Sequence, residues 1–324
     1  MTGAVIGIDL GGTKLSCALF SSDGAIVERS NAPLAARGGP DVGALIAAEV
    51  GSLLRSARGR VHGVGVAIPG IYRAATGTVW APNIPGWDDY PLVAELQAAV
   101  PPEVVVRADS DRACAILGEA WRGQARGCRN AIFLAVGTGI GAGILAEGVV
   151  LRGAGDAAGA IGWMALDRPY RAEYPAVGCF EYHGSGAGLA AVARRLLEEV
   201  PDHRGALRDV PSASLTAQHV FAAADAGDVL AQRVLDEAVE YWGMAVANLV
   251  SLFNPERIIL GGGVFGPAYR FLDRIRAEAK RWAQPISITQ VVIDVSALAG
   301  DAVLYGAGAL ALDADARSDA GVHA

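Results

Sequence analysis

The chain has 324 residues, of which 52% are apolar and 19% charged, and its formal net charge at pH 7 is -7. This length and composition suit one large or two ordinary globular domains, and the negative charge disfavours nonspecific nucleic-acid binding, because the field of the protein repels phosphate. No apolar run is long enough to span a membrane, and the N-terminus lacks the features of a signal peptide, so we expect a cytoplasmic protein with neither a membrane nor a nucleic-acid partner. The four cysteines form no CxxC pair, which argues against a disulfide framework and an evident zinc site.

The first expected feature is a tight glycine turn between two apolar strands, in the sequence IGIDLGGTKLSCALF at residues 6–20. Its glycine and polar residues are Asp9, Gly11, Gly12, Thr13 and Lys14. Backbone N–H groups, a hydroxyl and a lysine charge would form an anion cradle, while the aspartate could hold a hydrated divalent cation against the same anion. This chemistry suits a nucleoside triphosphate. The turn is not a Walker A loop, because no GxxxxGK[ST] is present and a strand follows the glycines, and an ordinary glycine hairpin is the alternative.

Strands and helices then alternate. We expect a strand at 26–29, an amphipathic helix at 41–58, a buried strand at 61–68 that runs into Pro69-Gly70, a loop at 82–86, a short helix at 91–100 and a strand at 104–106. That strand ends in Ala108-Asp109-Ser110-Asp111, and a helix follows at 112–121. Carboxylates at the carboxyl edge of a sheet are where open α/β folds place their chemistry. The alternative is that one of these residues caps the helix, although a cap leaves the cluster unexplained.

Residues 131–145, AIFLAVGTGIGAGIL, repeat the plan of strand, glycine turn and strand. The repetition predicts two domains of similar topology that face one cleft, with Gly137, Thr138 and Gly139 as a second phosphate cradle. A simple hairpin is again the alternative.

The second half of the chain is mainly helical. A loop-rich stretch covers 153–188, and we expect helices at 189–200, 215–253 with a break near Gly227, 268–283 and 301–312, strands at 257–260 and 288–295, and a disordered tail from Ala314. Gly261, Gly262 and Gly263 follow a strand directly. They would let the backbone lie flat against a planar group such as the adenine or the ribose.

Five segments come in the same order as in the ROK family of sugar kinases and related repressors, which belong to the actin-like ATPase fold. They are DLGGTK at 9–14, Pro-Asn-x-Pro-Gly-Trp at 82–87, the Asp111 segment ending in Leu117-Gly118-Glu119, GTGIGAG at 137–143, and Asn-Pro-Glu…Gly-Gly-Gly at 254–263. The resemblance covers nearly the whole chain. It implies an α/β fold of two actin-like ATPase (ribonuclease H-like) domains around a central cleft, which we place at 1–118 plus 302–324 and at 119–301.

The resemblance also implies ATP and Mg²⁺ on one side of the cleft and a hexose on the other. ATP and the metal would lie at the Asp9 turn, with Asp9 nearest to Mg²⁺, and at the second and third glycine segments. The sugar-contacting positions would be Gly70, Asn83, Asp109, Ser110, Asp111, Trp163 and Glu181. Asp111 would be the general base that takes the proton from the sugar hydroxyl, usually O6, as that oxygen attacks the γ-phosphorus. A homodimer is implied as well, and the apolar helix at 241–253 suits either a subunit face or the core.

The departures from the family pattern concern zinc and the sugar. Where the family reads Glu-x-Gly-His, this chain has Ala160-Ile161-Gly162-Trp163, and of the family's four zinc ligands only Cys179 remains, so we expect no structural zinc. Two sugar-contacting side chains are lost with these changes, while Glu181 is kept. An altered sugar is therefore expected.

The identity of this sugar is open. Asp109, Asp111 and Glu181 could form an acidic pocket for an amino sugar such as kanosamine or glucosamine, unless Asp109 points to solvent as a helix cap. Trp163 could stack on the sugar, but a packing role that fills the space left by zinc is favoured.

Two other functions compete with a kinase that phosphorylates a hexose or amino-hexose at O6. A repressor of the same family would need an N-terminal helix-turn-helix, for which a phosphate motif beginning at Asp9 leaves no room. A non-catalytic sugar- or nucleotide-binding regulatory protein would explain the eroded sugar pocket. The retained Asp111 and glycine cradles favour the enzyme.

Overall fold

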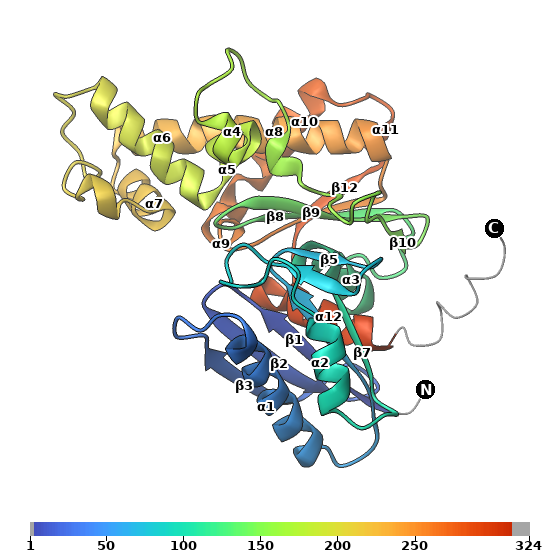
Figure 1. Cartoon of the computed structure of the whole chain (residues 1–324). Helices are drawn as coiled ribbons and strands as arrows, with labels where there is room; N and C mark the ends of the chain where they lie inside the picture. The colour runs from blue at the N-terminus through green and yellow to red at the C-terminus, as the bar shows by residue number, and fades with distance from the viewer. Residues whose placement is uncertain (1–2, 313–324) are drawn as a thin grey trace. The chain divides into compact units, whose positions relative to one another are not determined.

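The chain forms two compact α/β units in a computed structural model that describes residues 3–312 (Figure 1). Unit 1 comprises the described residues 3–127, 150–158 and 301–312, and unit 2 comprises 128–149 and 159–300. The domain boundary expected between residues 118 and 119 lies within helix α3 (Asp111–Arg122), which belongs entirely to unit 1. The tail expected from Ala314 lies outside the described residues.

Unit 1 is built on a five-stranded sheet in the order β3-β2-β1-β4-β7. Its strands are β1 (Ala4–Leu10), β2 (Lys14–Phe20), β3 (Ile26–Pro33), β4 (Val61–Ile68) and β7 (Val105–Ser110). The first three strands are antiparallel neighbours, while β1, β4 and β7 run parallel. The parallel strands therefore end at one edge, where the β1–β2 turn and the start of α3 also lie.

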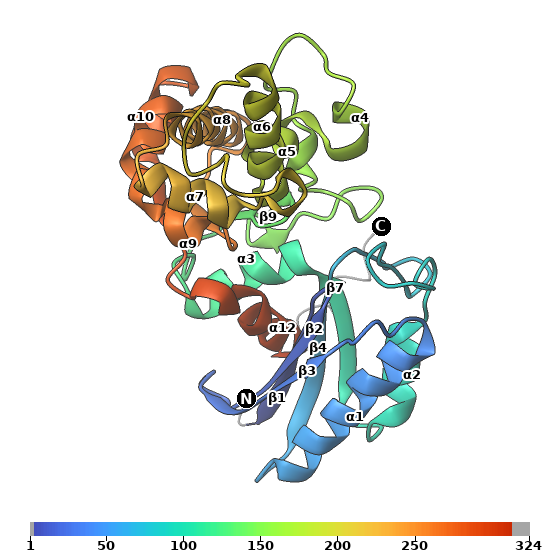
Figure 2. The ribbon, with the colours of Figure 1, turned by 90° about the vertical axis from the view of Figure 1, so that its left-hand side faces the viewer.

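Helices cover both faces of this sheet. Helices α1 (Pro40–Ser56) and α2 (Leu92–Ala99) lie on one face, and α3 and α12 (Ala302–Leu312) lie on the other (Figure 2). Glycines allow α12 to approach very closely: a Cβ on Gly65 would lie 1.9 Å from the Ala307 carbonyl oxygen, and one on Gly306 would lie 1.6 Å from that of Cys114. The small residues of the last helix thus serve backbone-to-backbone packing.

Unit 2 contains the second five-stranded sheet, in the order β10-β9-β8-β11-β12. Its strands are β8 (Ala131–Val136), β9 (Ile140–Ala146), β10 (Val149–Val150), β11 (Arg257–Gly261) and β12 (Val292–Val295). Its helices are α4 (Tyr174–Val177), α5 (Cys179–Gly184), α6 (Gly186–Glu199), α7 (Ala217–Asp225), α8 (Val229–Phe253), α9 (Phe265–Ala268), α10 (Leu272–Trp282) and α11 (Ser287–Gln290). The longest, α8, runs through the apolar core and is fixed by the Trp242 Nε1–H bond to the Gly184 carbonyl oxygen (2.9 Å).

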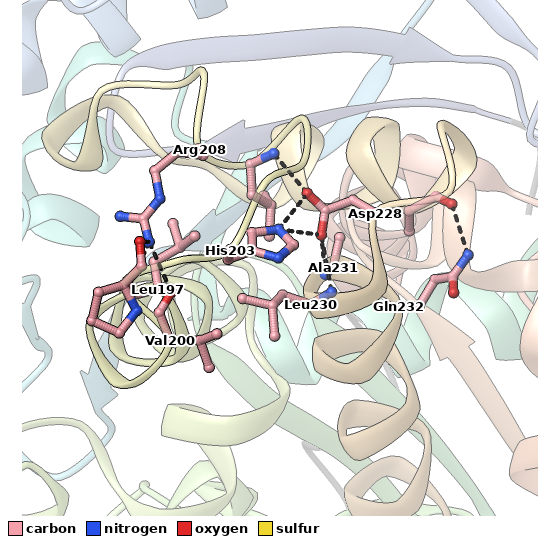
Figure 3. Close-up of polar contacts among 11 residues, drawn as sticks. Leu197, Val200, His203, Arg208, Asp228, Leu230, Ala231 and Gln232 are labelled. Atoms are coloured by element: carbon pink, nitrogen blue, oxygen red, sulfur yellow. Dashed lines mark hydrogen bonds and ion pairs between the residues drawn. The ribbon is translucent and has the colours of Figure 1, made fainter.

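Helix α8 begins at a buried carboxylate (Figure 3). One oxygen of Asp228 accepts hydrogen bonds from the N–H groups of Leu230 and Ala231 (2.9 and 3.1 Å). The other accepts from the N–H of Leu207 (2.9 Å) and contacts His203 Nε2 (3.1 Å). One side chain therefore caps the helix and ties the preceding loop to it.

Most of the expected elements are confirmed, including both glycine hairpins. The strand expected at 288–295 is wrong in its first half, because residues 287–290 form helix α11. The Gln284 side-chain oxygen accepts from the N–H groups of Ile286 and Ser287 (2.8 and 2.7 Å), which starts a helical turn instead. The short hairpin of β5 (Ile71–Arg73) and β6 (Thr78–Trp80) is not anticipated by the pattern. Over residues 3–312, no helix is both long and apolar enough to cross a membrane.

Candidate active site

The β1–β2 hairpin of unit 1 has an exposed glycine tip. Asp9 pairs with Ser16 and Leu10 with Leu15 in the ladder, and the Gly11 N–H bonds to the Lys14 carbonyl oxygen (2.9 Å). Gly12, Thr13 and Lys14 are exposed beyond this bond. The hairpin thus presents the backbone and the lysine charge that an anion would need, as the sequence predicts.

Electrostatics at the base of this hairpin suit a divalent cation. Burial, and secondly the charge of Asp111, raise the pKa of Asp9 to about 6, and Lys14 offsets only part of this rise. A carboxylate held in this way gains from a nearby cation, and Mg²⁺ binds through one or two carboxylates, water and phosphate oxygens. Asp9 therefore fits the role of a Mg²⁺-holding residue on chemical grounds.

Strand β7 ends in the Asp109-Ser110-Asp111 cluster. Ser110 is the N-cap of α3, and its hydroxyl accepts from the Ala113 N–H (3.2 Å). Asp111 is the first residue of the helix, where one oxygen accepts from the Arg112 N–H (2.7 Å). Burial raises the pKa of Asp111, while Arg112 opposes this effect. A partly buried carboxylate at a helix N-terminus is suited to accept a proton from a bound hydroxyl group.

Asp109 has a partner that the sequence analysis missed. Its carboxylate is buried, so the alternative of a solvent-facing helix cap is wrong. One oxygen accepts from the Ser110 N–H (2.9 Å), and the other accepts from both Nε and Nη2 of Arg152 (3.0 and 2.5 Å). Asp109 thus forms a buried ion pair within unit 1, and the acidic-pocket interpretation loses one free carboxylate.

Gly70 and Asn83 lie on different parts of unit 1. A Cβ on Gly70 would lie 2.0 Å from the Trp80 carbonyl oxygen, so the close approach of the chain there requires glycine whatever ligand binds. Asn83 is exposed, and its Cβ lies 3.7 Å from the position of a Cβ on Gly12. The structure therefore brings Asn83 to the glycine hairpin, while it gives Gly70 a packing role.

Two glycine segments meet in unit 2, at the ends of the neighbouring parallel strands β8 and β11. Gly262 has φ +90°, and a Cβ there would lie 2.4 Å from the Val136 carbonyl oxygen, which also accepts from the Val264 N–H (3.0 Å). The Gly137 carbonyl oxygen accepts from the Gly186 N–H at the start of α6 (2.8 Å). The segments at 137–139 and 261–263, which the sequence assigns to the nucleotide, thus belong to one backbone surface.

Glu181 on helix α5 is tied to the same hairpin. Its Oε2 accepts from the Ile140 N–H (2.6 Å), and Cβ atoms built on Gly139 and Gly162 would lie 2.8 and 2.9 Å from that oxygen. Burial raises the pKa of Glu181, and the bond from Ile140 opposes the rise. The carboxylate is therefore held between the glycine hairpin and the turn that carries Trp163.

Trp163 is not a buried packing residue. It ends the short turn η1 (Ile161–Trp163) and is 57% exposed, so the favoured packing role is wrong. The indole lines a cavity of about 230 Å³ together with Tyr170, Gly178 and Cys179. A Cβ on Gly178 would lie 2.4 Å from the Gly162 carbonyl oxygen, so the chain packs closely against the turn that carries Trp163.

Hydrogen bonds hold the loop in which the family pattern places zinc ligands. The Tyr174 hydroxyl donates to Asp167 (3.1 Å) and contacts His183 Nε2 (2.8 Å), and the Cys179 sulfur accepts from the Leu166 N–H (3.4 Å). Burial lowers the pKa of His183 to about 4, so its ring is neutral at pH 7. Over the described residues 3–312, no group of three or more His, Cys, Asp or Glu side chains is arranged to hold a metal ion.

The candidate residues therefore fall into two clusters, one in each unit. Asp9, Lys14, Asn83 and the Asp109–Asp111 cluster belong to unit 1, and Trp163, Glu181 and the two remaining glycine segments belong to unit 2. The sequence analysis missed Arg152, which is 43 residues from its partner Asp109. No periodicity or motif signals such a pair.

The chain is similar to known proteins over nearly its whole length. The sequence model of the ROK family matches residues 5–314. A glucokinase of Halalkalibacterium halodurans is 33% identical over 313 residues, which cover 94% of this chain and 93% of that enzyme. A xylose repressor of Caldicellulosiruptor bescii is 29% identical over 314 residues, which cover 94% of this chain and 77% of the repressor. The crystal structure of a ROK family glucokinase from Streptomyces griseus, in complex with glucose and AMPPNP, matches with a TM-score of 0.76 at 27% identity and covers 96% of this chain and 100% of that one.

Proposed function

The chain belongs to the ROK family of sugar kinases and has their actin-like ATPase fold, and we propose that it transfers the γ-phosphoryl group of ATP to the 6-hydroxyl group of a hexose of the glucose type. The observation that carries this proposal is the position of Asp111, a partly buried carboxylate at the N-terminus of α3 that interacts electrostatically with Asp9. The glucokinase relatives support the substrate class, and the AMPPNP complex of one of them supports the nucleotide.

Asp111 acts as the general base in this reaction. Its raised pKa makes it a stronger proton acceptor than an exposed aspartate, while the dipole of α3 favours its ionised form. It takes the proton of the 6-hydroxyl as that oxygen closes on the γ-phosphorus. Most of the acceleration comes from positioning and charge neutralisation, since phosphoryl transfer requires little covalent chemistry from the protein.

The phosphate groups are bound by backbone and lysine. The exposed N–H groups and Lys14 of the β1–β2 hairpin serve this purpose in unit 1, and the segments at 137–139 and 261–263 serve nucleotide binding in unit 2. When bound, Mg²⁺ neutralises phosphate charge, and Asp9 would hold it. Glu181 and Trp163 bind the sugar in unit 2, the first by hydrogen bonding and the second by its exposed indole face.

A substrate panel tests the proposal. ATP- and Mg²⁺-dependent phosphorylation would be measured on glucose, mannose, N-acetylglucosamine, N-acetylmannosamine, glucosamine and kanosamine. We expect turnover of a glucose-type sugar, which Asp111→Asn lowers by about 10²- to 10⁴-fold in kcat. Asp41→Asn, an exposed aspartate in the first turn of α1, is the matched control and should leave kcat unchanged.

A regulatory protein without kinase activity is the second candidate, because the repressor relative is 29% identical to this chain. It would bind sugar or nucleotide and turn over neither. No phosphorylation of any sugar on the panel, with nucleotide binding retained in calorimetry, would favour this candidate and refute the kinase.

A homodimer is part of the proposal. In the helix at 241–253 most apolar side chains are buried in the core, but Leu252 is 74% exposed. Outside this helix, Trp282 and Ile286 are 61% and 64% exposed. The Gln284 N–H bond to Ser251 Oγ (3.1 Å) joins the segments that carry these three side chains. Light scattering should give twice the chain mass, and Leu252→Asp should shift the protein to the monomer; a monomeric wild type would refute the dimer.

A further inference from the structure

The ion pair of Arg152 and Asp109 lies beside the proposed base. Asp109 is the penultimate residue of β7, two residues before Asp111, and one oxygen of its buried carboxylate accepts from both Nε and Nη2 of Arg152 (3.0 and 2.5 Å). The Cys114 thiol on α3 is within electrostatic reach of Asp109, Asp111 and Arg152, all of which affect its pKa after burial, the main cause of its rise. The pair and the base therefore act on the same small region of unit 1.

Arg152 is held in place from its own side. Its Nη1 donates to the Val150 carbonyl oxygen (3.1 Å), and its carbonyl oxygen accepts from the Ala158 N–H (2.9 Å). Further along the same segment, Asp156 accepts from the Ala74 N–H of the β5–β6 hairpin (3.2 Å). The segment at 150–158 is thus fastened to unit 1 at two points, although both flanking segments belong to unit 2.

The net charge of this region would act on any charged group of a sugar bound beside Asp111. An unpaired buried carboxylate would attract an ammonium group, whereas a carboxylate that is paired with an arginine, as Asp109 is through one oxygen, forms an ion pair with almost no net charge. A hexose with an ammonium group would also bring a positive charge close to Arg152. An uncharged hexose would be neither attracted by the carboxylate nor repelled by Arg152.

We propose that Arg152 is a specificity-determining residue, which neutralises Asp109 and thereby makes the sugar site select an uncharged hexose over a hexose that carries an ammonium group. This inference rests on the proposed sugar kinase function. Arg152, which lies outside the motifs described in the sequence analysis, would thereby influence the choice of substrate.

The test compares the kcat/KM ratio of glucosamine to glucose, at a pH at which the amine is protonated, in wild type and Arg152→Gln. The freed carboxylate should raise this ratio by about tenfold, the size expected for a charge pair at moderate distance in a partly solvated site. N-acetylglucosamine carries an uncharged group at the same carbon, so its ratio to glucose should not rise. An increase for both sugars would indicate a steric effect and would overturn the proposal.

Two further variants separate charge from folding. Asp109→Asn combined with Arg152→Gln removes both charges, so it leaves no unpaired buried ion and should return the ratio to the wild-type value. Arg152→Lys keeps the positive charge and should also stay near the wild-type ratio. If the single variant does not fold, a ratio raised in either of these two variants would overturn the proposal.

The outcomes distinguish this inference from the proposed function. If wild type phosphorylates no hexose, the kinase proposal fails. The selectivity can then still be measured by calorimetry, as the ratio of the affinities for glucosamine and glucose in wild type and in Arg152→Gln. If wild type is a kinase but the ratio is the same in wild type and Arg152→Gln, with both substrates losing activity equally, Arg152 only supports the structure and the inference is refuted.

Discussion

Replacing Asp228 by alanine should remove the hydrogen bonds that fix the start of helix α8 in unit 2. The loss of the helix cap to Leu230 and Ala231 costs about 1 kcal/mol. The Leu207 N–H and the His203 ring are buried and would lose their acceptor, which adds roughly 1–3 kcal/mol for the N–H and about 1 kcal/mol for the ring. The expected loss is about 3–5 kcal/mol, a large part of the roughly 5–15 kcal/mol that stabilises a typical domain.

The effect should depend on pH. Burial alone would raise the pKa of Asp228, but the hydrogen bonds from Leu207, His203 and Ala231 lower it on balance below its ordinary value of 3.8. A carboxylate with a lowered pKa in the folded state contributes stability above its ordinary pKa and loses it as the pH falls through the lowered value. The difference between wild type and variant should therefore be complete at pH 7 and shrink below about pH 4.

Hydrogen exchange followed by mass spectrometry suits this prediction, because two units need not unfold together. Peptides from 201–216 and from the first turns of α8 should lose protection in Asp228→Ala at pH 7. The control is Asp236→Ala on the same helix, whose exposed ion pair with Arg274 should contribute less than about 1 kcal/mol. Equal protection in the two variants, or a loss below about 1 kcal/mol in both, would refute the role of the buried carboxylate.

Two further predictions concern the proposed nucleotide site. Asp9→Asn should abolish turnover yet raise the stability of the metal-free protein at pH 7 by up to about 3 kcal/mol, because a pKa raised from 3.8 to about 6 means that the ionised form is disfavoured on folding. The gain should vanish below about pH 4, and a lower melting temperature of the variant at pH 7 would contradict it. Gly262→Ala should lower the free energy of unfolding by roughly 1–3 kcal/mol and weaken ATP binding in calorimetry, since the φ of Gly262 is +90° and the new Cβ meets the Val136 carbonyl oxygen. The control is Gly263→Ala, where a Cβ meets nothing within 4 Å, and equal effects of the two substitutions would argue against this explanation.

The features that the sequence predicts well are those set by local physics. Alternating apolar residues around glycines define the β1–β2 and β8–β9 hairpins, and helical spacing defines α1 within two residues at each end. The convergence of the glycine segments at 137–139 and 261–263 is different, because it depends on β8 and β11 being neighbouring parallel strands, which the residue pattern does not predict.

What the sequence analysis missed depends on side chains far apart in the chain. Arg152 reaches Asp109 across 43 residues, and the turn that carries the exposed Trp163 packs against Gly178 from a later part of the chain. Helix α11 replaces an expected half-strand because one side chain, Gln284, satisfies two backbone N–H groups. Each of these features depends on a contact between residues far apart in the chain or on a side chain that caps a backbone turn. The local residue pattern shows neither kind of contact.

In the proposed function, phosphate is bound mainly by backbone groups and the sugar mainly by side chains. The proposed phosphate-binding turns at 9–14 and 137–139 would use backbone groups, so this role would depend on glycine positions. Packing restricts such positions, since a Cβ on Gly262 in the adjoining glycine segment would meet the Val136 carbonyl oxygen. A sugar bound by side chains, as proposed, would lose a contact when one of them is substituted, without any movement of the backbone. Ala160 and Trp163 stand where the family pattern described above has a glutamate and a histidine, and the turn between them packs closely, since Gly162 lies against Glu181. A change of substrate is therefore accessible by substitution here, whereas a change of nucleotide chemistry would require a different fold of the hairpins.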